Sequence, residues 1–143
     1  MAGSITLRVI TPERIVVDTT ASEIKFPALD GSMGVLPRHA TMVAALDSGA
    51  LSWSHAGEGG EMFVSGGFAE VRDNTVRIVT EASEHASEID VERAERAAER
   101  ARERLRNRGG GRELSLLELD TVRAEGALRR ALMRKLVATK AGL

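Results

Sequence analysis

The C-terminal part of the sequence is crowded with arginines at spacings that suit the binding of phosphates or carboxylates. Arg100, Arg104 and Arg108 recur at i, i+4 and i+8, and Arg130 and Arg134 at i and i+4, so each set would share one helix face. A guanidinium group offers paired N–H donors that match the oxygens of phosphates and carboxylates. These arginines therefore fit an acidic protein partner, or the phosphates of a nucleotide bound between two helices.

A solvated charged surface is the alternative explanation of the same arginines. Acidic residues are interleaved with them, and Glu92–Arg96 and Glu99–Arg102 have the spacing of ion pairs along one helix. The interleaved acids argue against nucleic acid binding. With one tryptophan, three phenylalanines and no tyrosine, the chain also lacks a platform for base stacking.

Catalytic and metal-binding patterns are missing from the sequence. His39, His55 and His85 stand apart from one another, there is no cysteine, and no H-E-x-x-H zinc signature occurs. Ser65 precedes two glycines but does not form a G-x-S-x-G elbow, and no phosphate-binding G-x-x-x-x-G-K-[ST] loop is present. We therefore expect neither an enzyme nor a metal site, and a small hydrolase using His39 or Ser65 is the least favoured class.

The elements that position these residues fall into two regions that differ in charge. Residues 1–86 carry 6 Lys and Arg against 11 Asp and Glu, whereas residues 87–143 carry 14 against 10. The first region is thus about −5 and the second about +4, which predicts two domains with different partners. No apolar run approaches the ~20 residues of a membrane span, and no signal peptide is recognisable, so we expect no direct membrane insertion.

The first region predicts an antiparallel β-sandwich or barrel. Ile5 to Ile10 alternates apolar and polar residues, as a half-buried strand does. Turn signals at Asp30-Gly31, at 47–49, at 58–60 and at Asp73-Asn74 separate further short strands. The expected strands are Ile5–Ile10, Ile15–Val17, Glu23–Phe26, Met42–Leu46, Leu51–Trp53, Met62–Val64, Phe68–Val71 and Val76–Val79. Gly66-Gly67 would relieve a close backbone contact or form a bulge.

The second region predicts an antiparallel hairpin of two helices. Ser87 can cap the first helix, with Asp90 in its first turn, and the 109–111 glycines end it. Ser115 and Glu118 have the spacing of a capping box for the next helix. An apolar stripe follows each helix: Ala94, Ala97, Ala98, Ala101 and Leu105, then Ala124, Ala127, Leu128, Ala131 and Leu132. The fold class is therefore α+β, a sandwich followed by a helical hairpin.

The first stripe is too small to hold the hairpin firmly. A buried methyl contributes ~0.8 kcal/mol, so its four alanines and one leucine bring roughly 5 kcal/mol as an upper estimate. Ordering each residue costs ~1–2 kcal/mol, and helices of this length are marginal alone. The hairpin is therefore either a thinly packed permanent structure or a two-state element that ligands and partners can bias.

Three motifs in register resemble those of epsilon subunits of bacterial F-type ATP synthases. Gly31 to Ala40 resembles their G-x-x-G-x-x-P-x-H-A block, and Phe63 to Val71 resembles their glycine-containing strand motif. Ile89 to Ala94 is similar to their [I/L]-D-x-x-R-A helix start, and order, spacing and length agree over essentially the whole chain. The resemblance implies a non-catalytic subunit of the rotor's central stalk, peripheral to the cytoplasmic face of the bacterial membrane.

The resemblance also implies partners for each region. Residues 1–86 would bind the gamma subunit and rest on the c-ring, coupling rotation to ATP synthesis. The c-ring-facing and gamma-facing positions would be Asp30, Gly31, Ser32, Met33, Gly34 and His39. Some family members have an acidic residue where this chain has Ser32, so a salt bridge from that position is lost. Residues 87–143 would extend toward an acidic segment of the beta subunit and inhibit ATP hydrolysis.

Some bacterial members bind ATP between the folded helices, and the matching residue types are present here. The implied ATP site consists of Glu84, Ile89, Asp90, Arg93, Arg100, Arg130 and Arg134. Arg100, Arg130 and Arg134 could bind the phosphates, and Asp90 could accept a hydrogen bond from the base or the ribose. ATP would then be a regulatory ligand, with no cofactor required. The alternative function is that of a free-standing ATP-sensing module, because the same hairpin could bind ATP without partner subunits.

Overall fold

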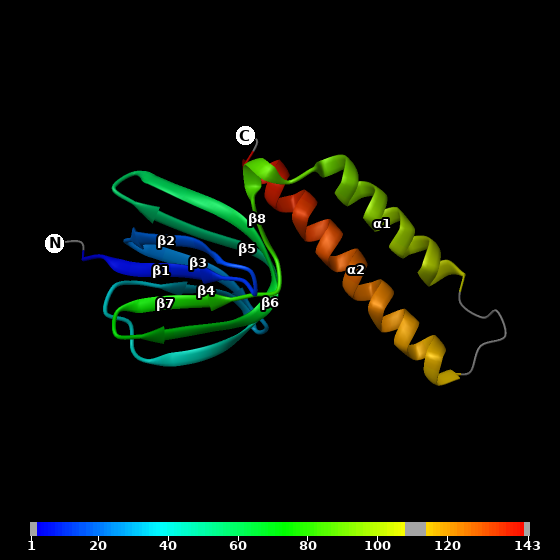
Figure 1. Cartoon of the computed structure of the whole chain (residues 1–143), viewed down its shortest axis with the longest axis horizontal. Helices are drawn as coiled ribbons and strands as arrows, with labels where there is room; N and C mark the ends of the chain where they lie inside the picture. The colour runs from blue at the N-terminus through cyan, green and yellow to red at the C-terminus, as the bar shows by residue number, and fades with distance from the viewer. Residues whose placement is uncertain (1–2, 108–113, 142–143) are drawn as a thin grey trace. The chain divides into compact units, whose positions relative to one another are not determined.

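The computed structural model describes residues 3–107 and 114–141, and within the second stretch the side chains of residues 120–140 (Figure 1). The chain divides into two compact units, Met1–Ala86 and Ser87–Leu143. The first is a β-sandwich and the second contains two helices. This confirms the predicted α+β fold class.

The first unit contains eight strands that belong to one folded-over sheet. The hydrogen-bonded order is β2-β1-β7-β6-β5-β3-β4, and β8 pairs separately with β6. The ladder between β1 and β7 is parallel, so the sheet is antiparallel as predicted except at this pair of strands. The strands are β1 Ile5–Ile10, β2 Ile15–Ala21, β3 Glu23–Ala28, β4 Gly31–Val35, β5 Met42–His55, β6 Glu58–Arg72, β7 Thr75–Val79 and β8 Ser83–His85.

The core of the sandwich lies between its two layers and consists of large apolar side chains. In β1, Ile5, Leu7 and Val9 are buried while the residues between them are half-buried, as period-two alternation requires. Phe26 from β3 and Leu51 from β5 are fully buried in the same cluster. Residues from seven different strands, β1 to β7, thus meet in one close-packed core.

Two predicted turns are wrong, because residues 47–49 lie within β5 and residues 58–60 lie within β6. Ser48 pairs with Ser65 directly after Leu46 pairs with Gly67, so the 47–49 segment stays in the strand. The turn expected at 58–60 lies at Ala56-Gly57 instead, where φ is 51° and 82°. Two successive positive φ values are typical of the two-residue hairpin turn that matches strand twist. These two long strands contribute to both layers of the sandwich, and a prediction from the turn residues alone does not detect this.

The turn at Asp73-Asn74 is confirmed, and its two φ values are 50° and 54°. The sequence analysis missed β4 and β8, since β4 contains two glycines and β8 has only three residues. The turn expected at Asp30-Gly31 leads directly into β4, which begins at Gly31 and pairs with β3.

Gly66 and Gly67 both have positive φ, 95° and 109°. A Cβ atom on Gly67 would collide with the carbonyl oxygen of Val79, while no register shift occurs between β5 and β6 at this point. Close backbone contact, rather than a bulge, is therefore the reason for the paired glycines.

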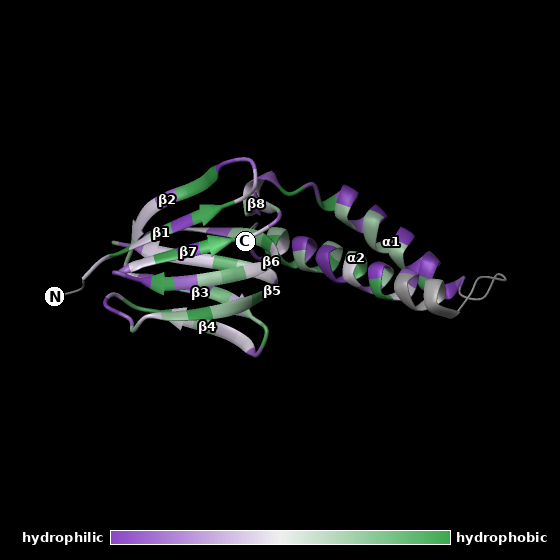
Figure 2. Ribbon diagram, turned by 60° about the horizontal axis from the view of Figure 1, so that its bottom comes forward, coloured by the Kyte–Doolittle hydropathy of each residue, from purple (hydrophilic) through white to green (hydrophobic). Residues whose placement is uncertain are grey.

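The second unit contains α1, Val91–Arg106, and α2, Leu114–Ala141, which pack against each other. The 3₁₀ turn η1, Ala86–Glu88, precedes them. Figure 2 shows polar and apolar segments alternating along α1, as an amphipathic helix requires. Since α2 already begins at Leu114, Ser115 lies inside the helix and is not its cap. The glycines at 109–111 and Arg108 lie outside the described residues.

Candidate functional site

Asp90 begins α1 as its N-cap. Its backbone is extended, with φ −81° and ψ 100°, and its Oδ1 accepts a hydrogen bond of 3.0 Å from the Arg93 backbone N–H. The prediction that Ser87 caps this helix is wrong, because Ser87 belongs to η1. One Asp90 oxygen is thus engaged in satisfying a helix-end donor, which leaves the other for a ligand.

The contact between α1 and α2 is made by small side chains. Ala94, Ala98 and Ala101 on α1 and Ala124 and Ala131 on α2 are buried, with exposures of 1–4%. Ala97, Leu105, Ala127 and Leu128 from the predicted stripes are half-buried, and Leu132 is 37% exposed. The predicted stripes are therefore confirmed at their centres. We call the line of buried alanines, Ala94, Ala98, Ala101, Ala124 and Ala131, the alanine seam, and the larger side chains lie at its edges.

Acidic side chains line one flank of this seam. Lys135 of α2 donates to Glu95 of α1 at 2.7 Å, which joins the two helices on that flank. Glu99 lies one turn further along α1 and pairs with Arg106 at 2.8 Å and Arg102 at 3.7 Å. The hydrogen bond from Lys135, and its charge, lower the pKa of the Glu95 carboxyl below its usual value.

The other flank holds the predicted phosphate-binding arginines. At 100° per residue, Arg93 and Arg100 project on the side of α1 away from Glu95. Arg130 and Arg134 likewise project on the side of α2 away from Lys135. Because Lys135 meets Glu95, the structure brings these four arginines to one side of the hairpin.

Three of those arginines carry charge without an ionic partner. Arg93, Arg100 and Arg130 are exposed, and none makes an ion pair with another described side chain. The Nη1 atom of Arg130 lies 3.2 Å from the place of a Cβ on Gly126, so this mid-helix glycine leaves room for the guanidinium. Sequence analysis missed Gly126, although a glycine within a helix is itself a signal of close approach.

The remaining residues of the implied ATP site have separate locations. Ile89 is 8% exposed and directly precedes the Asp90 cap. Glu84 belongs to the other unit, where it pairs in β8 with Phe63 of β6. The predicted intrahelical pair of Glu92 with Arg96 is present at 3.8 Å, as is that of Glu99 with Arg102.

A groove of about 370 Å³ follows the alanine seam on the flank of Glu95. Its lining includes Glu99, Arg102, Leu132 and Lys135. The groove therefore lies on the side opposite to Arg100 and Arg130, and its cations already pair with acids. It is not the predicted nucleotide site.

In the first unit, the predicted partner-facing residues gather at the β3–β4 turn. Asp30, Gly31 and Ser32 are exposed, and they line a hollow of about 500 Å³ together with Met33. Two apolar neighbours of this hollow face solvent, Leu29 with 64% and Val43 with 70% of their surfaces exposed. Gly34 follows in β4, whereas His39 lies beyond that strand and its Nδ1 donates to the Ala40 carbonyl oxygen at 2.8 Å.

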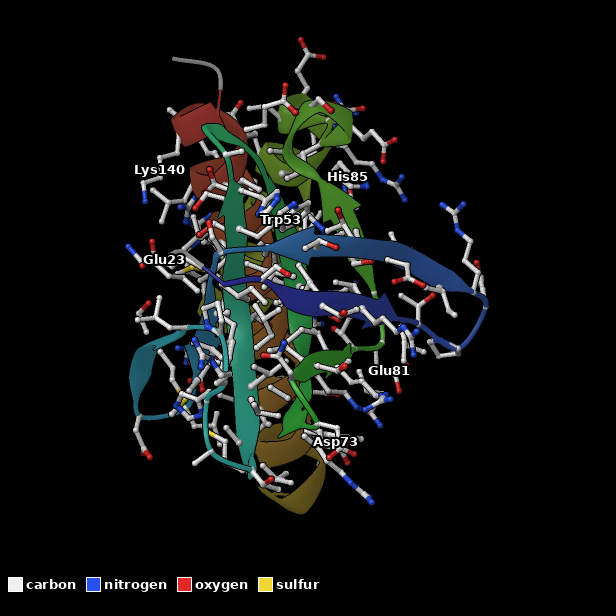
Figure 3. All side chains as sticks on the ribbon, turned by 90° about the vertical axis from the view of Figure 1, so that its left-hand side faces the viewer. Glu23, Trp53, Asp73, Glu81, His85 and Lys140 are labelled. Atoms are coloured by element: carbon white, nitrogen blue, oxygen red, sulfur yellow. The ribbon has the colours of Figure 1, made fainter. Side chains whose placement is uncertain are left out.

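Ser65, which was considered for hydrolysis, and His85, another of the isolated histidines, both have structural contacts. The Ser65 hydroxyl oxygen accepts from the Ala82 N–H at 3.0 Å, and the Ser65 N–H donates to the Thr80 hydroxyl at 3.2 Å. His85 packs edge-on against Trp53, with ring centroids 6.5 Å apart, and both are labelled in Figure 3. Within the described part of the chain, no group of three or more acidic or histidine residues could hold a metal ion.

No described helix is both long enough and apolar enough to cross a membrane.

Two family models match consecutive stretches of the chain. The ATP synthase delta/epsilon chain β-sandwich domain matches residues 4–86, and the long α-helix domain of the same family matches residues 87–138. Two curated relatives are similar along nearly their whole length. The ATP synthase epsilon chain of Nitratidesulfovibrio vulgaris is 38% identical, over 94% of this chain and 95% of the relative. That of Symbiobacterium thermophilum is 44% identical, over 92% and 91%.

Solved structures of ATP synthases contain similar chains. One chain in the Euglena gracilis mitochondrial OSCP/F1/c-ring structure matches with a TM-score of 0.78 and 26% identity, over 97% of this chain and 81% of that one. A chain of the Tetrahymena thermophila central stalk and c-ring matches with a TM-score of 0.65, over 93% and 95%. Its 15% identity supports the fold alone.

Proposed function

The chain belongs to the ATP synthase delta/epsilon family, and on that premise we propose that it is a non-catalytic central-stalk subunit of an F-type ATP synthase. The match of both family models, in sequence from residue 4 to residue 138, carries this proposal. It favours a subunit that couples rotation to ATP synthesis over a free-standing ATP sensor or a hydrolase.

Co-purification is the test of the stalk assignment. Tagged chain should recover the gamma subunit and the c-ring from membranes of its own cells, and should sediment with the membrane fraction only when gamma is present. Purified chain should hydrolyse no ATP. Recovery of the chain free of gamma would favour the sensor, and turnover by the pure chain would favour the hydrolase.

The β3–β4 turn is the proposed contact with the c-ring. Asp30, Gly31 and Ser32 are exposed there, and the adjacent Leu29 and Val43 leave apolar surface uncovered. A subunit that never left solution would hide such side chains more completely. Docking on gamma and the c-ring would account for the exposed turn and for the exposed apolar side chains. It would hold the protein at the cytoplasmic face of the membrane, with no part of the chain inserted into the membrane.

The helical unit is the proposed regulatory element. Its seam consists of alanines, each of whose methyl groups contributes only ~0.8 kcal/mol. Packing of this size supports two arrangements close in free energy, one folded on itself and one extended toward the acidic part of the beta subunit. The extended arrangement would inhibit ATP hydrolysis.

Truncation of the assembled complex tests this regulatory role. The intact complex should hydrolyse ATP more slowly than a complex whose subunit lacks residues 87–143. Equal rates would remove the inhibitory role while leaving the stalk role in place.

ATP is the proposed ligand of the folded hairpin. Arg93, Arg100 and Arg130 share one flank with Arg134, and the first three have no ionic partner among the described residues. Phosphate oxygens would satisfy those donors. By mass action, ATP would then stabilise the folded arrangement whenever its concentration exceeds the dissociation constant.

Calorimetry of the full chain tests the ATP site. The Arg130→Ala variant should bind ATP at least about tenfold more weakly, since a charge-assisted pair is worth about 1.5–3 kcal/mol. Arg102→Ala is the matched control, because Arg102 lies on the opposite flank and pairs with Glu99. Equal binding by all three proteins would reject the site.

A further inference from the structure

The last strand of the sandwich, β8, makes few backbone contacts. It consists of Ser83, Glu84 and His85, and in the described part of the chain it pairs with β6 and with no other strand. The three residues are half-buried, and the Ser83 hydroxyl is buried without a hydrogen-bond partner among the described atoms. Short elements with few contacts are the first parts of a protein to open locally. Further contacts are therefore needed to keep β8 on β6.

The chain that enters β8 is fixed by a buried hydrogen-bond network. Thr80 is 2% exposed, and its hydroxyl donates to the Ala82 carbonyl oxygen at 3.2 Å and accepts from the Ser65 N–H at 3.2 Å. The Ser65 hydroxyl oxygen accepts in turn from the Ala82 N–H at 3.0 Å. Because every member of this network has a partner, the network resists opening. The chain is therefore anchored as far as Ala82.

A contact between two rings fixes the other end of β8. Trp53 of β5 and His85 pack edge to face, with ring centroids 6.5 Å apart and an interplanar angle of 69° (Figure 3). Trp53 pairs with Gly60 of β6 and His85 pairs with Met62, so the indole has to cross β6 to reach the imidazole. Gly60 permits this crossing, because a Cβ atom there would collide with the indole ring. We call Trp53, Gly60 and His85 the ring clasp.

The ring clasp lies where the chain leaves the sandwich. His85 ends β8, η1 begins at the next residue, Ala86, and α1 begins at Val91. Residues 86–90 thus form the tether between the ring clasp and α1. Opening of β8 would lengthen this tether to residues 83–90, which adds about 10 Å at about 3.3 Å per residue.

We infer that the ring clasp sets the length of the tether by keeping β8 docked on β6 while the helical unit changes its arrangement. This inference rests on the proposed regulatory role and names the residues that limit the movement. Trp53 and His85 are then positioning residues, since a short tether keeps the helices at a higher effective concentration near any contact site. A longer tether would lower that concentration and weaken the inhibition of ATP hydrolysis.

Amide hydrogen exchange in the full chain tests the ring clasp itself. His85→Ala removes one ring and Gly60→Ala displaces the other, so each should speed exchange in β8 about threefold to tenfold. His85→Phe keeps a ring and should exchange at nearly the wild-type rate. His55→Ala is the control, because His55 is exposed at the end of β5. Unchanged exchange in β8 after both His85→Ala and Gly60→Ala would overturn the inference, and unchanged exchange in β1 would show that the variants are folded.

A disulfide between β6 and β8 tests the consequence in the assembled complex. The chain has no cysteine, and Val64 and Ser83 are directly paired, so Val64→Cys with Ser83→Cys would join the two strands. Inhibition is measured as the ratio of ATP hydrolysis rates without and with residues 87–143. His85→Ala should lower this ratio at least about threefold, and the disulfide should restore it. In the otherwise wild-type chain the disulfide should leave the ratio unchanged.

The outcomes separate this inference from the regulatory role. Loss of inhibition when the disulfide is placed in the wild-type chain would overturn the inference, because β8 would then have to leave β6 during the movement. Full inhibition by the His85→Ala complex would also overturn it and leave the regulatory role standing. Absence of inhibition by the wild-type chain would reject the regulatory role and this inference with it.

Discussion

The sandwich and the hairpin are each stabilised internally, and the buried side chains inside the two units differ greatly in size. In the sandwich, Leu7, Phe26 and Leu51 are fully buried in one cluster. In the hairpin, the buried contacts between α1 and α2 are made mainly by alanines such as Ala98 and Ala131. A buried leucine or phenylalanine contributes about 1.5–3 kcal/mol, whereas one methyl contributes about 0.8 kcal/mol.

This difference fits the division of tasks that we propose for the two units. A platform that is to transmit torque needs a core that resists deformation, and the densely packed sandwich has such a core. An element that is to change its arrangement needs contacts that can be exchanged at low cost, and a seam of alanines with charged flanks would provide those.

The largest expected effect is a core truncation in the sandwich. Leu7→Ala should lower the free energy of unfolding by about 2–5 kcal/mol, because it leaves a cavity at a fully buried site. Leu132→Ala in α2 is the matched change and should cost about 1 kcal/mol or less, since Leu132 is 37% exposed. Denaturation followed by Trp53 fluorescence and by circular dichroism would measure both. Similar losses at the two sites would contradict the contrast between the units.

A glycine substitution in β6 should have the next largest effect. Gly67→Ala should destabilise the sandwich by about 2 kcal/mol or more, because φ is positive and the Cβ would meet the Val79 carbonyl. Gly34→Ala is the control, since nothing lies within 4 Å of its added Cβ. The two melting temperatures give the comparison, and equal values would show that β6 and β7 can separate freely at Gly67.

A smaller effect is expected from the cap of α1. Asp90→Ala should weaken the helix by about 1 kcal/mol, because the Arg93 N–H loses its acceptor. Asp90→Asn retains a side-chain oxygen and should lose little. Amide exchange in α1 measures the effect, and exchange in β1 should stay unchanged. Faster exchange in both units after Asp90→Ala would mean that they open together.

The smallest expected effect is the pH dependence of the Glu95–Lys135 pair. Lys135 lowers the pKa of Glu95 in the folded hairpin, so the unfolded state binds more protons between the two pKa values. The pair's contribution is present above the ordinary pKa of 4.5 and is lost as the pH falls through the lowered value. Helix melting of the wild type and of Lys135→Met should converge in that acidic range. A constant difference at every pH would show that the ion pair does not contribute.

Local pattern was sufficient for much of this molecule. Alternation in β1 and alanine spacing in α1 predicted both elements, because each reflects the period of its own backbone. One failed prediction depended on a partner elsewhere: Asp47 to Gly49 reads as a turn, but its pairing with β6 keeps it extended. The Ser87 cap failed for a local reason, because Ser87 lies within the η1 turn and Asp90 caps α1 instead.

The sequence alone determined the fold class, the family resemblance and the residue types that could bind ATP, since these depend on residue identity and spacing along the chain. Only the tertiary structure decided which residues meet: Glu95 with Lys135 across the hairpin, and Arg8 with Arg77 across a parallel ladder. The physical reason is that strand register and helix rotation are fixed by packing between distant segments, and no local pattern in the chain specifies that pairing.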